Sequence, residues 1–251
     1  MRAEARISVA SVARKGLAML RAAGDERVAA QARKYFKPQE KVRFFGVKSA
    51  GIDEIEKEIF AMVRPAWALP QAVRFCDTLM RSRFLEAKGA GIVLLARFHG
   101  HYDERLLDAV YGWLDAGFCD NWATTDVLST RVVAQLLRRR PGLLEELQGW
   151  TRSDCMWVRR AAAVSLTPLA RHGEHLDAAY RVAAALLGDA EDLMHKAVGW
   201  LLRECGKTDP LRLESFLLAH GPRIPRTALR YAVERFPEAQ RRRILLLTRT
   251  G

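Results

Sequence analysis

A tryptophan and an aspartate stand four residues apart in the segment NWATTD at positions 121–126. On a helix, residues at this spacing share one face, so the side chains of Trp122 and Asp126 would point the same way. An indole face attracts cations, and a fixed carboxylate can stabilise positive charge or activate a water molecule. The pair therefore suits a reaction that develops positive charge. The simpler alternative is a core tryptophan followed by a surface aspartate that complements the dipole near a helix start.

Similar residues return further along the chain. Trp157 and Arg160 belong to the segment WVRR, and Arg160 follows Asp126 by 34 residues. Trp200 follows Arg160 by another 40 residues. If each interval is one structural repeat, these residues fall on matching faces of adjacent units. The spacing then predicts one surface patch that contains a carboxylate, a guanidinium and two indoles.

The elements that must position this patch are helices. Apolar residues recur at helical spacing, convincing alternation of period two is absent, and Ala and Leu are abundant. Gly and Pro interrupt the pattern about every 12–20 residues, which predicts roughly a dozen or more helices. Two helices per unit give a repeat of about 35–40 residues, close to that of HEAT-type repeats. The sequences of segments 154–170 and 192–205 are loosely similar, as expected for two such repeats.

We therefore expect an all-α fold, an α-solenoid of HEAT-like helical repeats with a concave basic face, over a single domain at residues 1–251. A concave basic face would fit a duplex or another rod-like polyanion. The alternative is a compact helical bundle whose basic residues are scattered over the surface.

The composition narrows the class of partner. The 251 residues include 41 Lys and Arg against 29 Asp and Glu, a net charge of +12, and 49% are hydrophobic. This apolar fraction is that of a packed protein, and the positive charge favours a polyanion, either nucleic acid or an acidic membrane surface. No apolar run approaches the ~18 residues of a membrane span, and the N-terminus lacks the order of a signal peptide. A cytoplasmic protein is expected.

Metal and redox chemistry find little support in the sequence. The four cysteines are far apart and form no CxxC pair, which is typical of buried thiols in a reducing compartment. His99 and His101, like His172 and His175, flank glycine-containing turns and have no third or fourth ligand at a suitable spacing. We expect no metal and no cofactor. Trp67, Trp113 and Trp150 lie beside apolar helical runs and are expected in the core.

Five segments carry a resemblance to a known family. They are FFGVK at 44–48, NWATTD at 121–126, WVRRAA at 157–162, KAVGWLLRE at 196–204 and RTALRYA at 226–232. In this order and at this spacing they resemble the AlkD-type DNA alkylation repair enzymes, a family of DNA glycosylases built from HEAT-like repeats. The resemblance covers roughly residues 35–236, while residues 1–34, expected to form N-terminal helices, match poorly.

The resemblance implies a function and a role for each residue of the patch. The activity would be excision of positively charged N3- or N7-alkylated purines, such as 3-methyladenine and 7-methylguanine, from duplex DNA by a monomer in base excision repair. Asp126 would be the catalytic carboxylate, Trp122 and Trp200 would flank the deoxyribose of the lesion, and Arg160 would hold the adjacent phosphate. It also implies recognition through the sugar–phosphate backbone without a tight base pocket, and a nucleoid-associated location in a prokaryote.

The residue types suit that reaction. Alkylation makes the base cationic and therefore a good leaving group, so no general acid is required. Cleavage of the N-glycosidic bond develops positive charge on the sugar, as in glycoside hydrolysis. Asp126 could stabilise that charge or deprotonate the attacking water, and the indoles of Trp122 and Trp200 could stabilise the sugar.

Other cations are candidates for binding the DNA backbone. The main candidates are Lys48, Arg159, Lys196, Arg203, Arg226 and Arg230, and a wider set adds Arg83, Lys88, Arg131 and Lys207. The arginine runs at 138–140 and 241–243 are instead predicted to lie at helix ends, where the dipole favours cations.

The alternative function is a non-catalytic helical-repeat module that binds unusual DNA structures or a protein partner. A carboxylate beside phosphates weakens electrostatic attraction, so a pure binding module gains nothing from Asp126. The complete set of two indoles, carboxylate and guanidinium therefore favours the enzyme.

Overall fold

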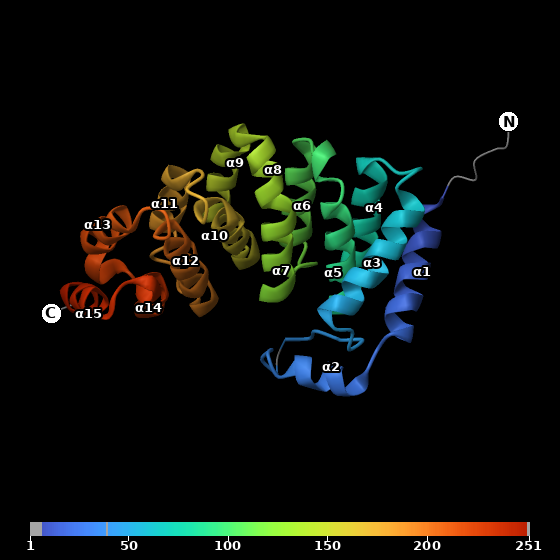
Figure 1. Cartoon of the computed structure of the whole chain (residues 1–251), viewed down its shortest axis with the longest axis horizontal. Coiled ribbons are helices and arrows are strands. Elements are labelled where there is room, and N and C mark those ends of the chain that lie inside the picture. Colours follow the sequence, from blue (N-terminus) through green and yellow to red (C-terminus); the bar gives the residue numbers. More distant parts are fainter. Residues whose placement is uncertain (1–6, 39, 250–251) are drawn as a thin grey trace. The chain divides into compact units, whose positions relative to one another are not determined.

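The protein is a chain of helices, most of them joined by short turns, with a longer irregular connection over residues 34–38 and 40–48 (Figure 1). The computed structural model describes residues 7–38 and 40–249. Over these residues there is no β-strand, and the only extended pairing is an isolated bridge between Arg43 and Phe84. The all-α prediction is confirmed.

The chain divides into two compact units, residues 1–132 and residues 133–251. The expected single domain over 1–251 stays a prediction. The helices of the first unit are α1 (Val9–Ala22), α2 (Glu26–Arg33), α3 (Ser49–Val63), α4 (Leu69–Met80), α5 (Leu85–Ala96), α6 (Arg105–Asp115) and α7 (Trp122–Leu128). Residues 1–6 of the expected N-terminal helices lie outside the described residues, and α1 and α2 confirm the remainder as helical.

In the first unit, α5 is the central helix. Its sequence is apolar on almost every side, and Ile92, Leu94 and Leu95 are completely buried. Helices α3, α4 and α7 all pack against α5, and α1 packs against α3 and α4. Because α7 rests on this buried helix, Trp122 and Asp126 are carried by a firmly supported element.

The second unit contains α8 to α15. These helices are α8 (Ala134–Arg139), α9 (Leu144–Gly149), α10 (Met156–Ala170), α11 (Leu176–Ala185), α12 (Asp192–Cys205), α13 (Pro210–His220), α14 (Arg226–Ala232) and α15 (Glu238–Leu247). Helix α10 is buried over most of its length, and α12 packs against both α10 and α14. Helices α10 and α12 carry Arg160 and Trp200.

The close approach of α12 and α14 depends on a glycine. A Cβ atom at Gly199 would lie 2.6 Å from the carbonyl oxygen of Ala228 and 2.6 Å from Cβ of Tyr231. Real Cβ atoms do not approach neighbours so closely, and the nearest of these atoms belongs to the backbone. The segments KAVGWLLRE and RTALRYA therefore form one tightly packed helix pair.

The two arginine runs behave differently. Helix α8 ends at Arg139, as predicted for the run at 138–140. The prediction for 241–243 is wrong, because these residues lie inside α15, which continues to Leu247. Arg is a good helix former, and Arg242 pairs with Glu238 one turn earlier, so the run extends the helix.

Most of the residues expected in the core are buried. Trp67, Trp113 and Trp150 are buried. Three of the four cysteines are buried too, whereas Cys155 is half-buried. Burial raises the pKa of Cys76 well above its usual value and that of Cys205 to about 12. These thiols are therefore packing residues and not nucleophiles.

Two searches of the described residues bear on membrane and metal binding. Over 7–38 and 40–249, no helix is long and apolar enough to span a bilayer. Among the same residues, no group of three or more His, Cys, Asp or Glu side chains could hold a metal ion.

Candidate active site

Helix α7 begins at the tryptophan of the NWATTD segment. Asn121 caps the helix, and its Oδ1 accepts a hydrogen bond of 2.9 Å from the backbone N–H of Thr124. The hydroxyl of Thr125 donates to the carbonyl oxygen of Cys119 at 3.0 Å, which ties the first turn to the preceding loop. Trp122 and Asp126 are both half-buried. The predicted helical placement of this pair is confirmed.

The indole of Trp122 stacks against a residue that the sequence did not single out. The ring of Phe36 lies 5.4 Å from it, with 17° between the planes, and Phe44 packs on Phe36 at 5.4 Å. All three rings are half-buried. The segment that follows α2 thus covers one side of the proposed site. The density of aromatic residues between 35 and 45 is the signal that could have indicated it.

A buried carboxylate holds the loop that carries Phe44. Glu86, in the first turn of α5, accepts hydrogen bonds from the backbone N–H groups of Phe45, Gly46 and Val47 at 3.0, 2.8 and 3.2 Å. Gly46 has φ +84°, and a Cβ there would lie 1.9 Å from the carbonyl oxygen of Asp25. Only glycine fits this position, which explains the FFGVK segment as a structural element beside the site.

In the second unit, Arg160 is directed into the protein. Its residue is 5% exposed, and Nη1 donates to the carbonyl oxygen of Leu193 at the start of α12, at 2.5 Å. The guanidinium therefore joins α10 to α12 in this structure. Its predicted contact with a DNA phosphate stays a prediction.

Trp200 lies on α12 directly after Gly199 and is half-buried. Because α14 packs against Gly199, the helix that carries the indole is fixed at that point. Trp122 and Asp126 thus belong to the first unit, and Arg160 and Trp200 belong to the second. That all four act on one substrate stays a prediction.

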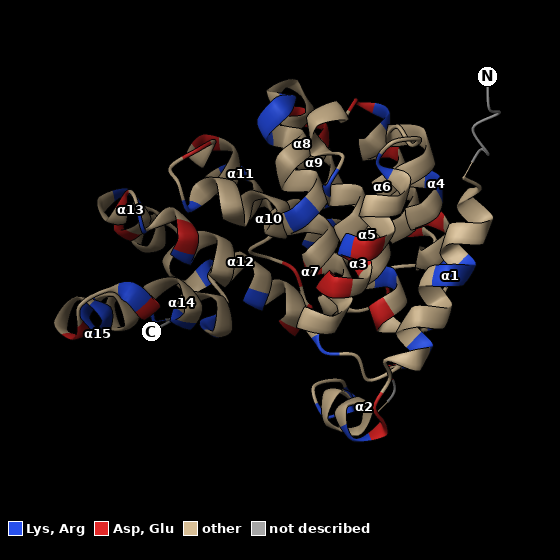
Figure 2. Cartoon of the chain, turned by 45° about the vertical axis from the view of Figure 1, so that its right-hand side comes forward, with Lys and Arg blue, Asp and Glu red and all other residues tan. Residues whose placement is uncertain are grey.

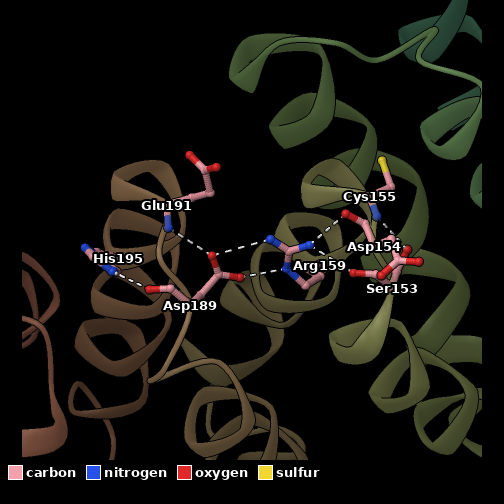
Figure 3. A network of polar contacts seen from close by, with 7 residues as sticks. All are labelled: Ser153, Asp154, Cys155, Arg159, Asp189, Glu191 and His195. Atoms are coloured by element: carbon pink, nitrogen blue, oxygen red, sulfur yellow. Dashed lines mark hydrogen bonds and ion pairs between the residues drawn. The ribbon is translucent and has the colours of Figure 1, made fainter.

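Arg159, a candidate for binding DNA, is part of an internal polar network (Figure 3). Its Nε donates to Asp189 at 2.7 Å, and its Nη1 donates to the carbonyl oxygens of Ser153 and Asp154 at 2.9 and 3.0 Å. The carbonyl oxygen of Asp189 also contacts Nε2 of His195 at 2.7 Å. With 19% of its side chain exposed, Arg159 links the turn before α10 to the turn before α12.

The other candidates divide into cations paired with an acidic residue and exposed cations without an acidic partner among the described residues. Lys196 pairs with Asp192 at 2.7 Å, and Arg203 pairs with Glu234. Hydrogen bonding to Arg203 lowers the pKa of Glu234. Lys48, Arg226 and Arg230 are exposed. Arg226 donates to the carbonyl oxygen of Leu245 at 3.4 and 3.5 Å, and Arg230 donates to the hydroxyl of Thr227 at 3.4 Å. Figure 2 shows Lys and Arg residues on helices of both units, interspersed with acidic residues. The predicted concave basic face stays a prediction.

Comparison with known proteins identifies the class of protein. No curated protein matches the sequence with statistical significance. The structure is similar to that of a predicted DNA alkylation repair enzyme from Enterococcus faecalis, with a TM-score of 0.73 and 16% sequence identity, over 86% of this chain and 97% of the other. This likeness confirms the helical-repeat fold class. The family model described as DNA alkylation repair enzyme matches residues 17–236, which begins earlier than the resemblance at 35–236. The chain belongs to the family of DNA alkylation repair enzymes.

Proposed function

We propose that this protein is a DNA glycosylase that removes positively charged N3- or N7-alkylated purines, such as 3-methyladenine and 7-methylguanine, from duplex DNA. The observation that carries the proposal is the placement of Trp122 and Asp126 one turn apart on α7, in a member of an alkylation repair family. The reaction is hydrolysis of the N-glycosidic bond, with water as the nucleophile and the neutral alkylated base as the leaving group.

Asp126 has the central role in this proposal. As the bond to the cationic base breaks, the sugar gains positive charge, which the carboxylate stabilises. The same carboxylate can accept a proton from the attacking water. Because the base already carries a positive charge, its departure needs no proton donor.

Trp122 and Trp200 have the role of stabilising the sugar through their aromatic faces. The face of Trp122 that contacts Phe36 is already covered, so the opposite face is the one we assign to the deoxyribose. Arg160 has the role of holding the phosphate beside the lesion, and the hydrogen bond from its Nη1 to the carbonyl oxygen of Leu193 holds the guanidinium against α12.

The experiment that tests the proposal is base release from N-methylated duplex DNA. We expect Asp126→Asn to lower the single-turnover rate about 100-fold or more, as with loss of other preorganised electrostatic groups. Asp115→Asn, which removes an exposed carboxylate at the end of α6, is the matched control and should act like the wild type.

The outcome separates the two candidate functions. Equal base release by the wild type and Asp126→Asn would remove Asp126 from the mechanism. If the wild type binds DNA but releases no base from any methylated duplex, the protein is a binding module and the glycosylase proposal is wrong.

A further inference from the structure

A basic pocket lies in the first unit, beside the start of α7. It is a cavity of about 640 Å³, and its lining includes Asn121, the residue that caps α7. Two of the lining residues, Glu40 and Asp120, are acidic. Six are basic, namely Arg33, Lys41, Arg43, Arg81, Arg83 and Lys88. A cavity with this excess of positive charge attracts anions.

Two of the arginines are held side by side by backbone hydrogen bonds. The N–H of Arg43 donates to the carbonyl oxygen of Arg83 at 3.1 Å, and the N–H of Leu85 donates to the carbonyl oxygen of Arg43 at 2.9 Å. Both arginines are exposed, and neither guanidinium has a hydrogen bond or ion pair to another described residue. Both residues line the same pocket, so an anion that enters it meets two positive charges that no acidic side chain offsets among the described residues.

Other basic residues of the pocket build its walls. The guanidinium of Arg33 donates to four carbonyl oxygens between residues 37 and 42 and so shapes that segment. Arg81 pairs with Asp77 and lies over the ring of Phe118 at 4.8 Å. These two cations are already engaged, so they shape the pocket and contribute charge without being free to grip a ligand.

Lys88 adds a buried charge to the lining. It is 8% exposed, and its Nζ donates to the carbonyl oxygen of Phe118 at 2.6 Å, with Asp120 at 3.6 Å. Asp120 offsets part of this positive charge, and the remainder adds to the attraction of the cavity for anions. Arg43 and Arg83 are therefore the arginines open to a ligand, and the exposed Lys41 adds a further positive charge to the same lining.

We propose that this cavity, the Arg43–Arg83 pocket, binds a backbone phosphate of the DNA strand next to the nucleotide that Trp122 contacts. Guanidinium groups bind phosphate oxygens through paired hydrogen bonds, which fits two open arginines at one cavity. Asn121 lines the pocket and Trp122 is the next residue, while phosphates follow one another about every 3.4 Å of axis along each strand. The assignment of the strand to Trp122 rests on the proposed function, whereas the binding of phosphate does not.

The test compares two double variants by the salt dependence of binding to a short undamaged duplex. Arg43→Ala/Arg83→Ala removes the open pair, and Arg74→Ala/Arg105→Ala removes two exposed arginines that do not line the pocket. Each bound phosphate contributes about 0.9 to the slope of log K against log salt. We expect the pocket variant to lose about 0.9 from that slope, and the control variant to keep the slope of the wild type.

The loss in slope has a direct consequence for affinity. Between 50 and 200 mM salt, the binding constant of the pocket variant should therefore fall about three- to fourfold less than that of the wild type, because one phosphate contact is lost. An unchanged slope in the pocket variant, or an equal change in the control, overturns the proposal. Arg43→Gln/Arg83→Gln, which keeps much of each stem, should repeat the result, and thermal unfolding followed by circular dichroism checks that both pocket variants are folded.

The alternative ligand of the Arg43–Arg83 pocket is free phosphate, which offers the same oxygen atoms as the DNA backbone. Calorimetric titration with inorganic phosphate and with a nucleoside monophosphate should show no saturable binding by the wild type at millimolar concentration. Saturable binding that Arg43→Ala/Arg83→Ala abolishes would overturn the DNA backbone as the ligand. The salt-dependence measurements use undamaged DNA, so they do not require glycosylase activity. If the wild type releases no base but its slope still depends on Arg43 and Arg83, the phosphate pocket is supported and only the proposed function is contradicted.

Discussion

At the scale of single residues, the stack of Phe36 on Trp122 decides how the proposed sugar-contacting indole is held. An aromatic pair of this kind contributes about 0.5–1.5 kcal/mol. We therefore expect Phe36→Ala to lower kcat/KM for base release about two- to twelvefold, because the indole of Trp122 loses the ring that orients it. The measurement is base release from N-methylated duplex under subsaturating DNA.

A conservative variant separates positioning from general stability. Phe36→Tyr keeps the ring and should restore most of the activity, with an unfolding temperature close to that of the wild type. If Phe36→Ala is as active as the wild type, Phe36 does not position Trp122. If Phe36→Tyr is as impaired as Phe36→Ala, the stacked ring is not the feature that matters.

The residues of the site differ in how far the sequence could predict them. Trp122 and Asp126 could be placed together because helix geometry fixes the relation of residues four apart. Phe36 could not, since its contact with Trp122 depends on how the segment after α2 returns to α7. The burial of Arg160 was also missed, because charge alone does not show that a guanidinium binds a backbone carbonyl such as that of Leu193.

At the scale of elements, the packing of α12 on α14 carries a second prediction. We expect Gly199→Ala to destabilise the protein by about 1–3 kcal/mol, because the new methyl group would overlap the backbone of α14 at Ala228. The two helices would have to separate, and Trp200 would move with α12. The measurement is the free energy of unfolding from a urea titration.

Gly112 is the matched control for this substitution. It lies inside α6, and a Cβ there would meet nothing within 4 Å. Gly112→Ala should therefore stabilise the protein by about 0.5–1 kcal/mol, since alanine has the higher helix propensity. The two Gly→Ala substitutions should thus change the free energy of unfolding in opposite directions. A Gly199→Ala protein as stable as the wild type would show that α12 and α14 do not need this close contact.

Most helices could be predicted from apolar periodicity and from the positions of Gly and Pro, but their ends and partners could not. The run at 241–243 is predicted at a helix end because the helix dipole favours cations there, yet it lies inside α15, where Arg242 pairs with Glu238. Likewise, KAVGWLLRE and RTALRYA could be singled out as motifs, whereas their mutual packing through Gly199 required the structure. Local spacing and local pairing determine where a helix forms and how far it extends, whereas its packing partners depend on tertiary contacts such as that at Gly199.

At the scale of the whole molecule, a net charge of +12 predicts a polyanionic partner. Membership of a DNA alkylation repair family indicates that this polyanion is DNA. The structure adds that many of the cations are engaged with the protein itself. Arg159, Lys196 and Arg203 all have acidic partners, while Arg43 and Arg83 are open at one pocket. Total charge therefore identifies the class of partner, and the pairing of individual side chains indicates where it would bind.

The last prediction concerns cooperation between the two units. If Trp122 of the first unit and Trp200 of the second act on the same sugar, their contributions to the rate depend on each other. We expect Trp122→Phe and Trp200→Phe to show an interaction energy of about 0.5–3 kcal/mol in a double-mutant cycle on single-turnover base release. The double variant would then depart from the product of the single effects by at least about twofold.

The control cycle pairs Trp122→Phe with Trp150→Phe, a buried tryptophan of the second unit outside the proposed site, and its effects should multiply. Multiplication in both cycles would mean that the two indoles work independently, and the assignment of Trp200 to the same sugar would be wrong. Coupling confined to the first cycle would place residues from both units at one substrate, which is what a catalytic role for the set requires.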